Sequence, residues 1–325
     1  MGKEMNQGGL YIMYKRITSA LFSGNKAAYL GMLVKVLRPF TMMLDSIKTN
    51  KITEEQRNNF KIPPCIMLVS PSRSGSTIIY QVLTRTIPCV YISNYHNLYP
   101  GSASAKMTKR DLFGKDGDNL NNFYGYTSSL YDVSEGNEIL EKIFEHNPKV
   151  GEIRKRFIDF LIHIGASSER PLIFKNVQSY HHLSRLHEAV PELMFLRISR
   201  STEKVAQSML RAYHELGYFY STPDEVKAHD TQDPIEFTVL HLLGIEKNIE
   251  KQLESVSADN VIRWTYEEFC SAPEKMMQDL LNRLFEQNAI APRMNPLNVH
   301  LSVSNRIKIS PEEAEKIKNY ILKHS

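Results

Sequence analysis

The run from Cys65 to Thr77 constrains the fold of this chain more than any other stretch. Its first five residues, Cys65 to Val69, are apolar or small, which indicates a strand buried on both faces. A polar loop containing Pro71 and Gly75 follows, and helical spacing of apolar residues resumes at Ile78. A strand, a tight loop and a helix in this order direct backbone N–H groups and the positive end of a helix dipole at one point. The stretch therefore predicts a loop that binds an anion such as phosphate.

The side chains of this loop add donors for the same anion. A guanidinium suits a phosphate or a sulfate, and hydroxyls donate further hydrogen bonds. The residues that we expect to bind the ligand are Arg73, Ser74, Gly75, Ser76 and Thr77. The loop departs from the nucleoside-triphosphate motif Gly-x-x-x-x-Gly-Lys-Ser/Thr, because serines replace its lysine and its first glycine. The alternative for this segment taken alone is an ordinary turn with polar residues.

A second candidate anion site lies beyond another apolar segment. Arg200 follows the strand expected at 193–198, and Ser208 comes eight residues later on the helix expected next. This spacing can bring a guanidinium and a hydroxyl to one anion at the end of the strand. The alternative for the pair taken alone is an exposed arginine and an ordinary helical serine.

Short apolar segments alternate with helical ones along the rest of the chain. The expected strands are 65–69, 88–93, 171–174, 193–198 and 261–264, and the expected helices are 76–86, 137–167, 180–190, 202–216, 235–256 and 273–285. This alternation predicts an α/β fold, a three-layer sandwich whose central parallel sheet is covered by helices on both faces. Ligands bind such sheets beyond the carboxyl ends of the strands, where both predicted anion sites lie.

These motifs, in this order, resemble those of the sulfotransferases that use 3′-phosphoadenosine 5′-phosphosulfate (PAPS). The loop at 73–77 is similar to the family's P-loop-like 5′-phosphosulfate loop in its carbohydrate-type variant, Arg-Ser-Gly-Ser-Thr. Arg200 and Ser208 are similar to the family's 3′-phosphate site, although the family usually has Arg-Asn/Asp-Pro where this chain has Arg-Ser-Thr.

Three further segments extend the resemblance over residues 62–325. The strand that leads to Lys175 is similar to a lysine-bearing strand of the family, and residues 264–269 resemble its strand followed by Tyr-Glu-Asp/Glu. Arg306 lies in a segment similar to the basic C-terminal loop that closes over the nucleotide.

The resemblance implies a reaction and roles for its residues. A sulfuryl group would pass from PAPS to a hydroxyl or amine of an acceptor, and no metal would be needed. Arg73 would stabilise developing charge, and His96 would act as the base, with His181 and His182 as alternatives. Lys175 would either neutralise sulfuryl oxygens or pair with a carboxylate.

An irregular insertion at about 94–136 is rich in Asn, Gly, Ser and Tyr. Insertions of this length between core elements are usually functional. We expect it to bind the acceptor, a carbohydrate or glycoconjugate, because aromatic side chains with polar tips can stack on a sugar; a lipid or a small metabolite is left open. Alternatively, the aromatic residues form a small core of the insertion itself.

Two other classes of protein compete with this interpretation. A P-loop kinase or nucleotide hydrolase would need a lysine in the loop and an aspartate after a strand to hold magnesium, and the expected positions hold neither. A non-catalytic protein that keeps the fold is the second alternative, and the presence of Arg73, Arg200 and Ser208 argues against it.

Composition adds expectations about partners and compartment. The net charge of +4 over 325 residues is mild, so we expect no nucleic-acid partner. The three cysteines lack metal-binding spacing, which is typical of reduced thiols in a core. Neither a signal peptide nor an Asn-x-Ser/Thr sequon is visible, so a cytoplasmic protein is expected.

The sequence divides into an N-terminal helical segment, 1–60, and a sulfotransferase domain, 61–325. Within the first, residues 10–48 are apolar and basic with helical periodicity, but charges interrupt them short of the roughly 20 apolar residues that a membrane span needs. This stretch is either an amphipathic helix lying on an anionic membrane surface or a pair of helices packed on the domain. Residues 48–62 are expected to be a solvated connector.

Overall fold

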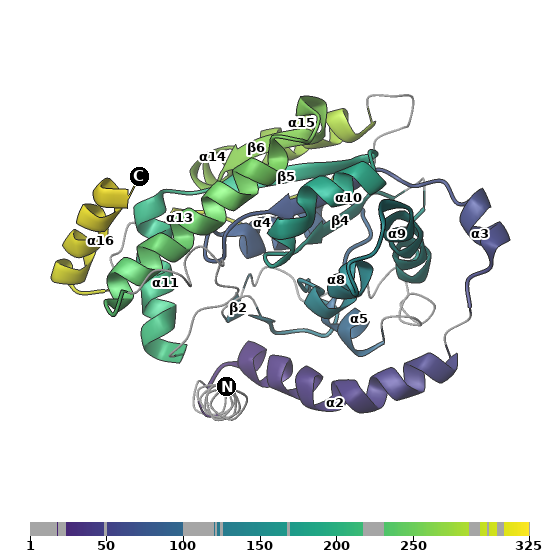
Figure 1. The fold of residues 1–325 in the computed structure, drawn as a ribbon, viewed down its shortest axis with the longest axis horizontal. Coiled ribbons are helices and arrows are strands. Elements are labelled where there is room, and N and C mark those ends of the chain that lie inside the picture. The colour runs from purple at the N-terminus through teal and green to yellow at the C-terminus, as the bar shows by residue number, and fades with distance from the viewer. Residues whose placement is uncertain are drawn as a thin grey trace.

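The structure is a computed structural model, and it describes residues 18, 24–48, 51–99, 120, 122–123, 126–167, 170–216, 231–285, 293–297, 299–303 and 309–324. Its centre is a parallel sheet in the order β4-β1-β5-β6 (Figure 1). The four strands are β1 (Cys65–Val69), β4 (Leu172–Lys175), β5 (Leu193–Ser199) and β6 (Val261–Thr265). The register pairs Leu68 with Lys175, Val69 with Arg197 and Ser199 with Thr265, so all four strands end at one edge. The predicted parallel sheet is confirmed.

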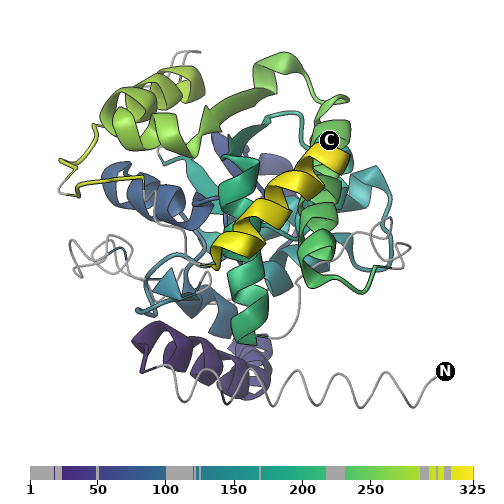
Figure 2. The same ribbon diagram turned by 90° about the vertical axis from the view of Figure 1, so that its left-hand side faces the viewer.

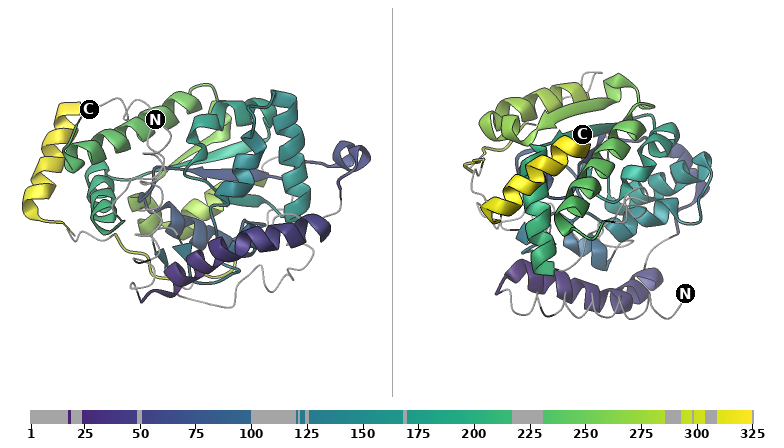
Figure 3. Two further views of the ribbon diagram at one scale, coloured as in Figure 1. Left: turned by 60° about the horizontal axis from the view of Figure 1, so that its bottom comes forward. Right: turned by 60° about the vertical axis from the view of Figure 1, so that its left-hand side comes forward.

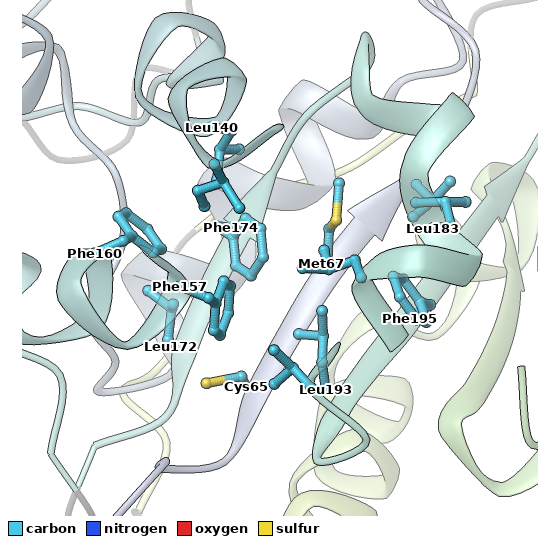
Figure 4. Packing of buried hydrophobic residues seen from close by; sticks show 14 of the residues in the cluster. Cys65, Met67, Leu140, Phe157, Phe160, Leu172, Phe174, Leu183, Leu193 and Phe195 are labelled. Atoms are coloured by element: carbon cyan, nitrogen blue, oxygen red, sulfur yellow. The ribbon is translucent and has the colours of Figure 1, made fainter. Parts of the chain in front are cut away.

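Both faces of β1 are buried under helices, as its apolar sequence predicts. Cys65, Met67 and Val69 join one core cluster (Figure 4), and Ile66 and Leu68 join the other. The helices over the first face are α8 (Asn137–Phe144), α9 (Val150–Ile164), α10 (Leu183–Ala189) and α13 (Pro234–Leu253); over the second they are α4 (Ser76–Thr86), α14 (Tyr266–Ser271) and α15 (Pro273–Phe285). The three-layer α/β sandwich is therefore confirmed.

A third core cluster holds the C-terminal helix α16 (Pro311–His324), which the sequence analysis did not identify. Ile317 of α16 packs with apolar residues of α11 (Thr202–Leu216) and α13 (Figure 2). The hydroxyl of Tyr320 donates to Asp233 at 2.8 Å, and Lys323 Nζ lies 2.9 Å from Glu236 Oε1. Hydrogen bonds from Lys323 and His324 hold the pKa of Glu236 down at about 2.

Two expected elements differ in the structure. The segment 88–93 forms no regular strand; it runs beside β4 through a single bridge between Val90 and Leu172. Pro88 has no N–H to donate, and the Cys89 carbonyl accepts from the Arg170 side chain at 2.9 Å, so the ladder does not extend. The helix expected at 137–167 divides into α8 and α9, because the link before Pro148 turns through left-handed backbone.

The described part of the N-terminal segment from residue 24 onward lies along one side of the domain (Figures 1 and 3). Its helix α2 (Lys26–Lys48) packs on α5 (Asn94–Leu98) and on the hairpin of β2 (Asn122–Phe123) and β3 (Tyr126–Thr127). The expected connector contains α3 (Glu54–Asn59), whose Arg57 bonds Asp159 of α9 through Nε at 2.6 Å. Two 3₁₀ turns, Ser179–His182 and Ala258–Asn260, complete the described elements. The division of the chain at residue 60 stays a prediction.

A buried ion cluster joins the sheet to α13. The Arg197 side chain on β5 is 3% exposed; its Nε donates to Glu250 at 2.9 Å, and its terminal nitrogens pair with Glu246 and the Ile198 carbonyl. Both glutamates are partly exposed. Removal of the arginine would leave two carboxylates beside an apolar sheet.

We expect Arg197→Ala to lower the free energy of unfolding by about 2–4 kcal/mol, below the range for a fully buried pair because both glutamates reach solvent. The control Arg211→Ala removes the exposed pair with Glu215 and should cost less than about 1 kcal/mol. Urea denaturation of both variants measures the difference. Equal, small losses would show that the cluster does not stabilise the sheet.

Candidate active site

The loop between β1 and α4 is held in a strained turn. Arg73 and Gly75 have positive φ angles of 69° and 89°, and a left-handed arginine costs about 1–2 kcal/mol. Ser70 Oγ donates to Ser76 Oγ at 2.8 Å, which ties the start of the loop to the first residue of α4. A strained backbone conformation persists only where the surrounding structure holds it, and strained residues of this kind are often found at functional sites.

Tyr266 joins three of the loops that follow the strands. A Cβ atom at position 75 would lie 2.3 Å from Cδ2 of the Tyr266 ring, so only glycine fits there. The guanidinium of Arg200, at the end of β5, lies over the same ring at 4.6 Å from its centroid. Burial, with a hydrogen bond to Cys270, raises the pKa of Tyr266 to about 12, so its hydroxyl keeps its proton at neutral pH. One aromatic ring thus sets the position of both candidate anion sites.

Several donors at this edge have no acceptor among the described residues. No side chain caps α4, and its first turn contains no acidic residue. Ser74 Oγ and Arg200 Nε are buried without a hydrogen-bond partner; Glu267 lies 3.8 Å from Arg200, too far for a hydrogen bond. Buried donors without partners are costly, and a bound anion would satisfy them.

Arg73 and Ser208 meet, although the sequence analysis assigned them to different phosphate sites. Arg73 Nε donates to Ser208 Oγ at 3.1 Å. The contact joins the loop after β1 to α11, across 135 residues of sequence. Arg200, the partner expected for Ser208, instead contacts Tyr266. The two expected anion sites are therefore neighbours in space.

Lys175 forms the other side of the site. It is 2% exposed at the end of β4, and its Nζ donates to Thr77 Oγ1 at 3.0 Å and pairs with Glu135 at 2.5 Å. Of the two roles expected for Lys175, the structure shows the pairing with a carboxylate. Glu135 was missed; the available signal was an acidic residue at the end of the polar insertion, directly before Gly136 and a helix.

His96, the expected base, is buried in α5 and bonds to its own helix cap. Its Nδ1 accepts from the Ser93 backbone N–H at 3.1 Å and lies 2.8 Å from Ser93 Oγ. Burial lowers the pKa of His96 to about 4. Its Nε2 is buried without a hydrogen-bond partner in the described part of the chain. The role of His96 as the base stays a prediction.

The remaining expected residues are only partly covered by the structure. Arg306 lies outside the described residues. His182, an alternative base, stacks on Phe144 with ring centroids 4.2 Å apart. In the insertion, the ring of Tyr95 packs beside Tyr99 and Tyr131 at 5.2 and 5.9 Å. Within the described residues, no group of three or more His, Cys, Asp or Glu side chains could hold a metal ion.

A comparison with solved structures finds similar chains among sulfotransferases, and the first of these shows the same fold. The crystal structure of sulfotransferase STF1 from Mycobacterium tuberculosis matches with 14% identity, covering 84% of this chain and 74% of that one, at a TM-score of 0.51. Sulfotransferase STF9 from Mycobacterium avium matches with 10% identity, covering 83% of this chain and 71% of that one, at a TM-score of 0.49. Mouse sulfotransferase SULT7A1 complexed with PAP matches with 13% identity, covering 83% of this chain and 89% of that one, at a TM-score of 0.33. A comparison with curated proteins finds no match.

A comparison with family models gives the broader result. The model described as the sulfotransferase family matches residues 64–286, which is most of the chain. The matched range contains the loop after β1, Lys175 at the end of β4, and Arg200 and Ser208 beyond β5. The chain therefore belongs to the sulfotransferase family.

Proposed function

We propose that the protein transfers a sulfuryl group from PAPS to a hydroxyl, or an amine, of an acceptor, which loses a proton, and that adenosine 3′,5′-bisphosphate is the leaving group. The observation that carries the proposal is that Arg73 of the first loop bonds Ser208 while Tyr266 contacts both Gly75 and Arg200. Two cationic groups are thereby held close together beyond the same edge of the sheet. A donor with phosphates at both its 5′ and 3′ positions suits such a pair.

The residues present fit that donor. The N-terminus of α4, Arg73 and the loop hydroxyls would hold the 5′ side, and Arg200 would hold the 3′-phosphate with Ser208 beside it. The unpartnered Ser74 Oγ and Arg200 Nε support this fit, since each would gain an anionic acceptor. When bound, PAPS supplies the activated sulfuryl group.

The charges around the loop are suited to the reaction. Transfer of this kind, by analogy with phosphoryl transfer, passes through a loose transition state whose charge spreads over peripheral oxygens. That charge would develop near two fixed hydrogen-bond donors, Arg73 and Lys175, and near the positive end of the α4 dipole. Lys175 is held in place by Thr77 and Glu135, so little reorganisation is needed.

We propose Glu135 as the general base that accepts the proton of the acceptor hydroxyl. Its carboxylate pairs with Lys175, which contacts Thr77 in the first turn of α4, where the donor would bind. The Glu135 side chain is 21% exposed and so has access to a ligand. His96 is a weaker candidate because its Nδ1 already accepts the Ser93 N–H.

The acceptor that we propose is a saccharide or glycoconjugate. The support is the polar, aromatic insertion at 94–136, whose described part carries Tyr95, Tyr99 and Tyr131 next to the segment of Glu135. Lipids and small metabolites belong in the same acceptor screen.

We expect adenosine 3′,5′-bisphosphate to raise the melting temperature without magnesium, and ATP with magnesium to raise it much less, because ligands that bind only the native state stabilise it. Thermal unfolding with each ligand, followed by assay of label transfer from PAPS to an acceptor panel, measures both steps. A larger shift with magnesium-ATP would favour a kinase. Nucleotide binding without transfer to any acceptor would favour a non-catalytic protein.

We expect Glu135→Gln to lower kcat by about 10²–10⁴-fold, the usual contribution of a general base, with bisphosphate binding retained. Glutamine keeps the shape of the side chain and an acceptor for Lys175. The exposed Glu141→Gln on α8 is the matched control and should keep its activity. An active Glu135→Gln variant together with an inactive, folded His96→Gln variant would return the role to His96.

A further inference from the structure

Helix α2 exposes a continuous apolar stripe. The described residues leave eight large apolar side chains exposed, and six of them lie on this one helix. They are Tyr29, Leu33, Val36, Leu37, Phe40 and Met43, with exposed fractions from 37% to 69%. Their spacing of mainly three or four residues places them on one side of the helix. A stripe of this length on one element differs from singly scattered apolar residues.

The apolar and polar faces of α2 are reversed with respect to an ordinary surface helix. The side toward the domain buries Ala27, Ala28 and Val34 together with two polar residues, Thr41 and Asp45. The six large apolar side chains of the stripe face away from the domain, whereas Leu30, Met32, Met42 and Leu44 are half-buried. Packing on the domain therefore does not account for the stripe, and the outer face of α2 is suited to a second apolar environment.

The charge of α2 indicates what that environment is. The helix contains four basic residues, Lys26, Lys35, Arg38 and Lys48, and a single acidic residue, Asp45, which is buried. The outer face therefore carries no acidic group. An apolar face on a helix of net positive charge is complementary to an anionic lipid surface, whose acyl chains take the apolar side chains and whose headgroups attract the charge of the helix.

Two other environments for the outer face of α2, the interior of a membrane and a second copy of the chain, fit less well. The segment Lys26–Asp45 is long and apolar enough to cross a membrane by length and composition, but its inner side packs on α5 and β3 and buries Asp45, so it lies along the domain (Figures 1 and 3). A second copy of the chain would bring one basic helix against another, which like charges oppose.

We propose that the outward face of α2 binds the surface of an anionic lipid bilayer, with the helix axis in the plane of the membrane. The protein is then attached peripherally and reversibly. This proposal does not depend on the reaction that the site catalyses.

Sedimentation of the full-length protein with vesicles tests the proposal. We expect binding to vesicles of phosphatidylcholine with phosphatidylserine, weaker binding to phosphatidylcholine alone, and release at high salt because salt screens the charges. The triple variant Leu33→Gln, Val36→Gln, Phe40→Gln should lower vesicle binding by about tenfold or more, since each change removes apolar contact with the bilayer. Glutamine is a good helix former, so α2 should persist.

The matched control is Leu322→Gln, which alters an 80% exposed leucine on α16 and should bind vesicles like the parent protein. Lys26→Glu combined with Lys35→Glu should weaken binding to anionic vesicles only. Thermal unfolding of each variant without ligand verifies that it is folded.

Four results would overturn the proposal. The parent protein could fail to bind anionic vesicles, or the triple variant could bind as well as the parent. A dimer in sedimentation velocity that the triple variant abolishes would assign the stripe to a second copy. Bound protein that resists extraction at alkaline pH would assign α2 to a membrane span.

Discussion

The contact between Gly75 and the ring of Tyr266 is the constraint on which the rest of the site depends. It fixes the loop after β1 against the start of α14, and Arg200 from the end of β5 lies over the same ring. The parallel register brings these strand ends to one edge, and the ring then sets how closely the loops approach. The hydrogen bond from Arg73 to Ser208 also connects the loop after β1 to α11. The segments that carry the two candidate anion sites are consequently linked by direct contacts.

Much of this arrangement could be predicted from the sequence because its signals are local. The apolar run of β1, the polar loop and the helix that follows are adjacent in the chain, and the alternation of strands and helices specifies the sandwich. The end of a parallel strand fixes the edge at which Arg200 and Lys175 lie, whatever the detailed packing. The family match over residues 64–286 agrees with the order of these motifs and disfavours the kinase alternative.

The features that the sequence did not predict depend on contacts between segments that are distant in the chain. Glu135 is identified by its pairing with Lys175, 40 residues away; its local signal, an acidic residue directly before Gly136 and a helix, does not indicate that partner. Ser208 Oγ accepts a hydrogen bond from Arg73 across 135 residues, a contact that the spacing of Ser208 from Arg200 does not predict. Local patterns also did not predict α16, which is stabilised by its packing on α11 and α13. They predicted a strand at 88–93 that does not form, because the Arg170 side chain donates a hydrogen bond to the Cys89 carbonyl, which a regular strand would use for pairing.

Calorimetric titration of Arg200→Ala with two ligands tests the central claim most directly. If Arg200 holds a 3′-phosphate, the variant should lose about 1.5–3 kcal/mol of affinity for adenosine 3′,5′-bisphosphate, as for a lost charge-assisted hydrogen bond. Its affinity for AMP, which lacks the 3′ group, should stay the same, whereas Arg73→Ala should weaken both ligands. Equal weakening of both ligands by Arg200→Ala would contradict the account, because Arg200 would then act through Tyr266 and Gly75 as a structural residue.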